Sequence, residues 1–124
     1  MKPMADTRFP DAGRLLPLPA VTFHVLMALA GGDRHGYAII QEVAARTENR
    51  LLLGAGTLYR SLERMLGQGL IAESGDRPAP ELDDERRRYY RLTPFGEAVA
   101  RAEARRLTEL VRLARASGFA RGRA

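Results

Sequence analysis

The chain has 124 residues, no cysteine and a formal net charge of +5. A chain of this length accommodates one domain with a modest core, and the lack of cysteine excludes disulfides, thiol catalysis and thiolate metal sites. The positive charge favours a polyanionic partner. It is carried almost entirely by arginine, since Lys2 is the single lysine, and a GC-rich genome would produce the same bias.

Several classes of protein find no support in the sequence. The longest apolar run, residues 25–30, is too short to span a bilayer, and no apolar region of a secretory signal follows Lys2. His24 and His35 are the only histidines, and neither has a carboxylate at the helical spacing of a metal site. No phosphate loop, nucleophile motif or carboxylate pair is visible. We therefore expect a cytoplasmic protein that is not an enzyme and has no metal, cofactor or membrane partner.

The N-terminal part is expected to contain an arm and one helix. Residues 1–16 have no hydrophobic periodicity, which is typical of a flexible arm. Pro19 suits the first turn of a helix that extends to about residue 30. This helix is apolar nearly all round, and a domain this small rarely buries a whole helix within one chain. We therefore expect a subunit interface to cover the side that carries Phe23 and Met27.

A break at residues 31–33 precedes a second helix, from Tyr37 to about Thr47. His35 is interpreted as a structural residue at the start of this helix rather than as a metal ligand. Gly36, which follows it, would allow a phosphate to approach the helix N-terminus. Residues 54–56 lead into the third helix, for which Gly54 is only a fair N-cap.

The third helix, which ends near Gly67, has two faces that differ in chemistry. One face is a narrow apolar stripe that can pack on a core, formed by Leu58, Leu62, Met65 and Leu66. The opposite face is polar and carries Thr57, Arg60, Ser61, Arg64 and Gln68. Such side chains suit the base edges and phosphates of a DNA major groove. Tyr59 lies at the margin of the stripe, where it either contacts phosphate or belongs partly to the core.

Two strands, residues 71–74 and 86–92, are expected on either side of a loop at 75–85. The loop has two prolines and a cluster of acidic residues, which is typical of a solvated turn. Arg86, Arg87 and Arg88 form the strongest local positive charge and would neutralise DNA phosphates. The alternative is that the acidic loop pairs with them in a surface network of little energetic value.

Thr93 and Pro94 are an N-cap and a first-turn residue for a last helix, residues 94–116. Its apolar side has no place inside a unit of three helices and two strands, so it should pack on another subunit. Glu103 and Arg106 fall within this side. They either pair across a partner helix or, as we favour, reach solvent at its edge. Residues 117–124 should form a frayed tail.

This order of elements predicts a mainly α protein with a small two-stranded β wing. Residues 17–93 would form a winged helix-turn-helix DNA-binding domain, and residues 94–116 a C-terminal dimerisation helix. The expected contacts with double-stranded DNA are Gly36, Tyr37, Thr57, Tyr59, Arg60, Arg64, Arg86, Arg87 and Arg88. The expected interface of a homodimer is formed by Phe23, Met27, Leu107, Leu110, Val111 and Ala114.

Four segments of the chain resemble the PadR family of transcriptional regulators. They are residues 23–29, the start of the second helix at His35-Gly36-Tyr37, the third helix with the residues after it (56–71), and residues 86–96, which end in Thr93-Pro94-Phe95-Gly96. The resemblance implies a homodimeric DNA-binding regulator, usually a repressor, whose C-terminal helix makes the dimer. It also implies that some relatives release DNA on binding an aromatic or cationic small molecule.

Two features depart from the family pattern and bear on the effector. The C-terminal part is a single helix, as in short members, and the chain has no tryptophan, which drug-binding relatives use to stack planar ligands. We therefore expect either a small neutral or weakly acidic aromatic ligand near the dimer interface, beside His24, or no ligand. The residues also fit two other functions: an architectural protein that coats DNA by charge alone, and a winged helix that serves a protein complex.

Overall fold

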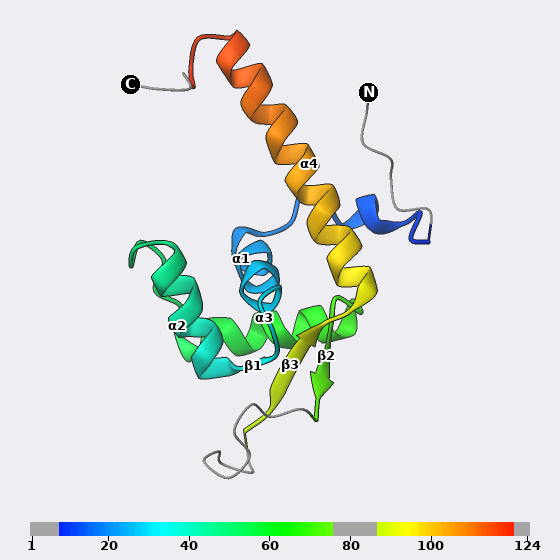
Figure 1. Cartoon of the computed structure of the whole chain (residues 1–124), viewed down its shortest axis with the longest axis vertical. Helices are drawn as coiled ribbons and strands as arrows, with labels where there is room; N and C mark the ends of the chain where they lie inside the picture. The colour runs from blue at the N-terminus through cyan, green and yellow to red at the C-terminus, as the bar shows by residue number, and fades with distance from the viewer. Residues whose placement is uncertain (1–7, 76–86, 121–124) are drawn as a thin grey trace.

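The computed structural model describes residues 8–75 and 87–120 (Figure 1). The elements of these two ranges are, in order, η1 (Ala12–Leu15), α1 (Ala20–Leu29), β1 (Arg34–His35), α2 (Gly36–Arg46), α3 (Ala55–Gly67), β2 (Ile71–Ser74), β3 (Tyr89–Leu92) and α4 (Pro94–Ala116). The expected mainly α architecture, with a β wing and a C-terminal helix, is confirmed. Within the described residues, no helix combines the length and apolarity that crossing a lipid bilayer requires.

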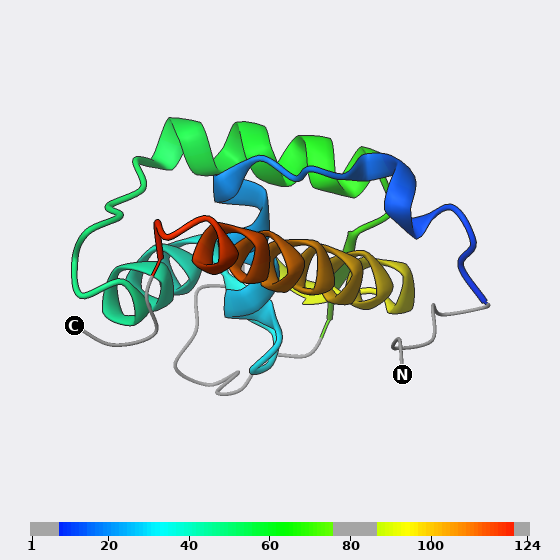
Figure 2. The same ribbon diagram turned by 90° about the horizontal axis from the view of Figure 1, so that it is seen from above.

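Helix α1 forms the centre of the core. It contacts α2, α3 and α4, and Figure 2 shows α4 crossing in front of it. Val25, Leu26 and Ala28 are fully buried, whereas Phe23 and Met27 on the remaining side are half-buried. Most of the apolar surface of α1 is therefore buried by other elements of the same chain. Pro19 stands at the N-cap, one position before the first helical residue.

The sheet has three strands in the order β1-β3-β2, both pairs antiparallel, rather than the two strands expected. The extra strand, β1, pairs Arg34 with Tyr90 and His35 with Tyr89, which fastens the start of α2 to the wing. Two residues are too few to show any periodicity, so this strand has no signal in the sequence. Strand β3 is the central strand, and its side chains do not alternate between buried and exposed at Tyr89 and Tyr90, which are both buried.

The described part of β3 begins at Tyr89, later than the strand at 86–92 that the sequence predicts. Residues 87 and 88 precede it without regular structure. The acidic segment at 76–85 and Arg86 lie outside the described residues, so the expectations for that loop and that arginine stay predictions.

Residues 8–16 differ from the flexible arm expected there. They include η1, which contacts α4, and Ala12 is buried. The Phe9 ring meets the Phe95 ring edge-on, with centroids 5.6 Å apart. This segment is held by its packing against α4, and a segment this short has no periodicity that a sequence reading could detect.

Glu103 is the one charged side chain in the core of the described residues, and it is 2% exposed. The backbone N–H of Leu18 donates to its Oε2 at 2.9 Å, and Arg106 donates to both carboxylate oxygens. The hydrogen bonds from Arg106 hold the pKa of Glu103 below its usual range, with burial acting in the opposite direction. The expectation that Glu103 reaches solvent is therefore wrong. Its carboxylate is buried because Leu18 and Arg106 of the same chain satisfy it.

The start of α4 is joined closely to the turn between α3 and β2. Thr93 caps the helix, because its Oγ1 accepts from the Gly96 N–H at 2.9 Å. The same hydroxyl donates toward two carbonyl oxygens, that of Gly69 at 2.6 Å and that of Leu70 at 3.0 Å. A Cβ placed on Gly96 would lie 2.0 Å from the Leu70 carbonyl oxygen. Only glycine allows α4 to approach the turn this closely.

Candidate nucleic-acid interface

Helix α3 has the two faces expected from the sequence. Leu58, Leu62 and Met65 are buried in the core, and Leu66 is half-buried at the side of the stripe. Four of the five residues expected on the opposite face are exposed, namely Thr57, Arg60, Arg64 and Gln68, and Ser61 is half-buried. No side chain caps the helix at Gly54. The buried stripe fixes the rotation of α3 about its axis, so the polar face points to solvent.

Tyr59 lies where α3 passes the start of α2. A Cβ on Gly36 would be 2.4 Å from the Tyr59 hydroxyl, so this hydroxyl occupies the space that a side chain at position 36 would need. Gly36 is consequently buried, and Tyr59 is 49% exposed. The structure thus gives the glycine a role that the sequence did not reveal, which is the close approach of two helices. Tyr37, the next residue, is exposed beside them.

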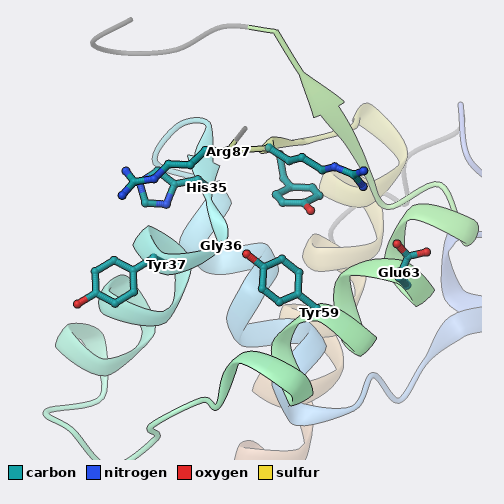
Figure 3. Close-up of a pocket in the computed structure, with 8 residues that line it drawn as sticks. His35, Gly36, Tyr37, Tyr59, Glu63 and Arg87 are labelled. Carbon is teal, nitrogen blue, oxygen red and sulfur yellow. The ribbon is translucent and has the colours of Figure 1, made fainter. Parts of the chain in front are cut away.

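An open cleft of about 380 Å³ lies between the start of α2, the exposed side of α3 and the residues that lead into β3. Its lining is polar and aromatic: His35, Gly36, Tyr37, Tyr59, Glu63, Arg87, Arg88 and Tyr90 (Figure 3). Burial raises the pKa of the Tyr90 phenol above its ordinary value. The cleft therefore brings together five of the nine residues expected to contact DNA, and it offers mainly hydrogen-bond donors.

The two described arginines of the wing make different contacts. Arg88 lies 3.5 Å from the Glu73 carboxylate on β2, an exposed ion pair of little energetic value. Arg87 reaches His35, and its Nη1 lies 3.1 Å from the imidazole Nε2. Figure 3 shows Arg87 lying against the His35 ring, close to Gly36. The partner acid Glu73 was missed in the sequence because the acidic loop seemed the obvious source of carboxylates.

His35 caps helix α2, as its expected structural role requires. Its Nδ1 accepts a hydrogen bond from the Ala38 N–H at 3.1 Å. Its ring also meets the Tyr89 ring edge-on, with centroids 5.3 Å apart. The position of His35 in the wall of the cleft was not predicted.

The residues expected at the dimer interface lie on a separate surface. Leu107, Leu110 and Val111 are exposed on the distal part of α4, which projects beyond the rest of the molecule in Figure 1. Phe23 and Met27 line a groove of about 540 Å³ between α1 and α4. Ala114 is half-buried near the end of the helix. The groove shares no lining residue with the cleft beside α3.

Three helices followed by a β wing, with a polar face on the third helix, define a winged helix-turn-helix protein of the kind that regulates transcription. A model of the "Transcriptional regulator PadR-like family" matches residues 25–102, which extend from α1 into α4. The chain belongs to this family, and the resemblance seen in its sequence is confirmed.

The chain is also similar to individual regulators of known sequence or structure. The transcriptional regulator Rv3488 of Mycobacterium tuberculosis is 33% identical over 93 residues, which cover 75% of this chain and 80% of that protein. A transcriptional regulator from Clostridium thermocellum is 25% identical with a TM-score of 0.63, over 75% of this chain and 87% of that one. BpsR of Bordetella bronchiseptica, whose DNA binding is regulated by 6-hydroxynicotinic acid, is 28% identical with a TM-score of 0.54, over 74% of this chain and 63% of that one.

Proposed function

We propose that the chain is a homodimeric, sequence-specific DNA-binding repressor that inserts α3 into the major groove. The observation that carries this proposal is the exposed face of α3, where Arg60 and Arg64 stand opposite the buried stripe. Arginine reads guanine through two parallel hydrogen bonds, and threonine at position 57 can donate to phosphate. Family membership and the DNA binding of BpsR support the same function.

The wing and the start of α2 would contact the DNA backbone on either side of α3. Arg86, Arg87 and Arg88 supply positive charge next to the groove, and Tyr37 is exposed at the start of α2. Contacts of this kind set the register and orientation of a protein on DNA without reading its sequence.

The dimer would form through the apolar side of α4 together with the exposed side of α1. Leu110 is 47% exposed and has apolar neighbours one turn away on both sides, and soluble monomers rarely expose such a stripe. A two-fold dimer would place two copies of α3 on one side and prefer a palindromic operator with half-sites about one helical turn apart.

An effector, if the chain has one, would be a small neutral or weakly acidic aromatic compound. The ligand of BpsR, 6-hydroxynicotinic acid, belongs to this class. The groove between α1 and α4 has the apolar side chains of Phe23 and Met27 to receive a ring, and its lining also includes Arg101, which is paired with Glu97. A thermal-shift comparison of phenolic and nicotinic acids with planar cationic dyes tests this preference. Stronger stabilisation by the dyes would contradict it.

The main experiment is selection of an operator from random DNA, followed by affinity measurements on the selected site. Arg60→Ala and Arg64→Ala should each cost roughly 1–3 kcal/mol of binding free energy if the residue reads a base edge. Arg14→Ala removes the same charge from an exposed position on η1 and should leave the affinity nearly unchanged. A reporter gene behind the selected operator then distinguishes repression from activation.

The two other functions give different outcomes in this experiment. An architectural protein would bind the selected and the scrambled site equally well at physiological salt, with a steep dependence on salt concentration. A protein-interaction module would bind neither site. Either result contradicts sequence-specific regulation.

A further inference from the structure

We infer that Glu63 of α3 determines part of the operator sequence, because its carboxylate accepts a hydrogen bond from the 4-amino group of cytosine in the major groove. The inference rests on the proposed function and extends it by naming a base that the operator contains. Glu63 was not among the residues expected to contact DNA. Its role follows from the direction in which it faces, from its lack of an ion pair and from the arginines beside it.

Glu63 lies on the side of α3 that faces away from the core. At about 100° per residue, it stands about 140° from Leu58, the middle of the buried stripe. Arg60 and Arg64 stand about 160° and about 120° from Leu58 in the opposite direction. All three side chains are exposed. A major groove that receives the two arginines of this helix therefore receives Glu63 as well.

Glu63 is an exception among the acidic side chains of the protein. Every other acidic residue in the two described ranges forms an ion pair with arginine. The pairs are Asp11 with Arg14, Asp33 with Arg91, Glu42 with Arg34 and Arg46, Glu48 with Arg50, Glu73 with Arg88, Glu97 with Arg101, Glu103 with Arg106, and Glu109 with Arg112. The carboxylate of Glu63 forms no ion pair or hydrogen bond with any residue that the structure describes.

The arginines closest to Glu63 do not neutralise it. Arg60 precedes it by three positions, and its Nη2 lies 3.5 Å from the Thr57 hydroxyl instead. An arginine that precedes an acid on a helix also pairs with it less well than one that follows it. Arg88 lines the same cleft but lies 3.5 Å from the Glu73 carboxylate. The oxygens of Glu63 thus remain available as acceptors on the face that is proposed to enter the groove.

The chemistry of the base edges decides which base an unpaired carboxylate can contact. A carboxylate only accepts hydrogen bonds, so acceptors on a base repel it. Guanine presents the acceptors N7 and O6 in the major groove, thymine presents O4, and adenine presents N7 beside its 6-amino group. Cytosine presents its 4-amino donor without an acceptor. Cytosine is therefore the base that satisfies Glu63 without opposing it, and guanine and thymine are excluded by repulsion.

The position of this cytosine is set by its distance from Arg60. Three residues along a helix correspond to about 4.5 Å, which is close to the rise of about 3.4 Å between base pairs. If Arg60 reads a guanine, Glu63 should read a cytosine at a neighbouring base pair. A symmetric dimer repeats this arrangement once in each half-site.

The decisive variant is Glu63→Gln, which keeps the size of the side chain and adds a donor. Glutamine pairs with the N6 and N7 of adenine. Selection from random DNA should give cytosine for wild type and adenine for the variant at one position of each half-site, with the other positions unchanged. Each protein should bind its own operator about 10-fold or more tightly than the other operator. The melting temperature should stay the same, because Glu63 is exposed and unpaired.

Two further variants separate base reading from a general effect of charge. Glu63→Ala should lose the preference at this position without gaining a new one. It should also bind scrambled DNA more tightly, because it removes a negative charge that faces the phosphates. Asp11→Asn removes the same charge from an exposed residue of η1 and should select the wild-type operator with unchanged affinity.

The outcomes distinguish this role of Glu63 from the proposed function. If wild type and Glu63→Gln select the same operator, Glu63 does not read a base, and the regulator remains. Guanine or thymine in the wild-type operator at the position that Glu63→Gln alters would also overturn the inference. If wild type prefers no site over scrambled DNA, the proposed function fails together with it. If Glu63→Gln melts early, Glu63→Ala decides: equal affinity for operators with each base at this position supports the contact, and a retained preference for cytosine overturns it.

Discussion

The two halves of α4 share one apolar side but have very different surroundings. The proximal half buries Val99 and Glu103 against the rest of the domain, whereas Leu110 and Leu113 in the distal half are exposed. Both halves contribute to one apolar side of the same helix. Apolar residues at helical spacing therefore identify the side of a helix that is suited to packing. Only the fold shows which part of that side is packed against the same chain.

This difference has a thermodynamic consequence. The proximal half contributes to the stability of a single chain at any concentration. In the proposed dimer, the distal half would contribute only through association, so its contribution would grow with protein concentration. Changes in the two halves should therefore be separable by measuring unfolding at several concentrations.

The largest effect is expected from Leu110→Glu in the distal half. A carboxylate in the centre of the proposed dimer contact occurs twice in a symmetric dimer and should cost roughly 3–5 kcal/mol of association free energy. The stability of the isolated chain should hardly change, because the side chain is exposed there. Sedimentation velocity across concentrations measures the result. A variant that still sediments as a dimer would show that the dimer contact does not include Leu110.

The next effect is expected from Gly96→Ala in the proximal half. The new Cβ would lie 2.0 Å from the Leu70 carbonyl oxygen, a backbone atom that can move only with the turn. We expect a loss of about 1–3 kcal/mol in unfolding free energy, independent of protein concentration. Gly67→Ala, where a Cβ would meet nothing within 4 Å, is the matched control and should be neutral or slightly stabilising. Equal behaviour of the two variants would refute the close approach.

Glu103→Gln should have a smaller effect that depends on pH. The pKa of Glu103 is lowered in the folded state, chiefly by the hydrogen bonds from Arg106, so the carboxylate stabilises the fold above the unfolded pKa. At neutral pH we expect a loss of about 1–2 kcal/mol. The difference in unfolding free energy between wild type and variant should shrink as the pH falls below about 4, because the unfolded state binds the proton at a higher pH than the folded state.

The control for this pair is Glu109→Gln, which removes an exposed ion pair with Arg112 on the same helix. It should change stability by less than about 0.5 kcal/mol. Both variants are best compared in the Leu110→Glu background, so that association does not contribute to unfolding. If the difference in unfolding free energy between wild type and Glu103→Gln stayed unchanged down to pH 3, the carboxylate of Glu103 would not be ionised in the folded state as described.

The smallest effect, about 1 kcal/mol, is expected from Thr93→Ala. This change removes the hydroxyl that caps α4 and contacts the Gly69 and Leu70 carbonyls. Thr93→Ser keeps the hydroxyl and should restore most of the stability in chemical denaturation. If serine were as destabilising as alanine, the methyl group rather than the cap would matter at this junction.

The sequence predicted those features that repeat along a helix or stand at its ends. The buried stripe of α3 was predictable because Leu58, Leu62 and Met65 recur at helical spacing, and the start of α4 because Thr93-Pro94 is a strong N-terminal signal. The positions of Arg60 and Arg64 followed directly from that stripe, since the opposite face of a core helix is exposed.

The features that were missed depend on contacts between distant segments. Strand β1 is only two residues long, and the burial of Glu103 needs a backbone N–H donated by Leu18, 85 positions away. The part played by Gly36 likewise depends on Tyr59 from another helix. Local periodicity carries no information on such pairs, so the sequence placed His35 at a helix end without placing it in the cleft.

Because Thr93 and Gly96 pack closely against Leu70, the start of α4 moves together with the turn that follows α3. With 23 residues at 1.5 Å each, the helix is about 34 Å long, and its first turn cannot move without the end of α3. A tilt of about 6° at the distal end displaces the proximal end by roughly 3.4 Å, which equals the rise of one base pair. In the proposed dimer, a small molecule that changed the angle between the two copies of α4 would therefore move each α3 out of register with DNA while remaining far from the groove.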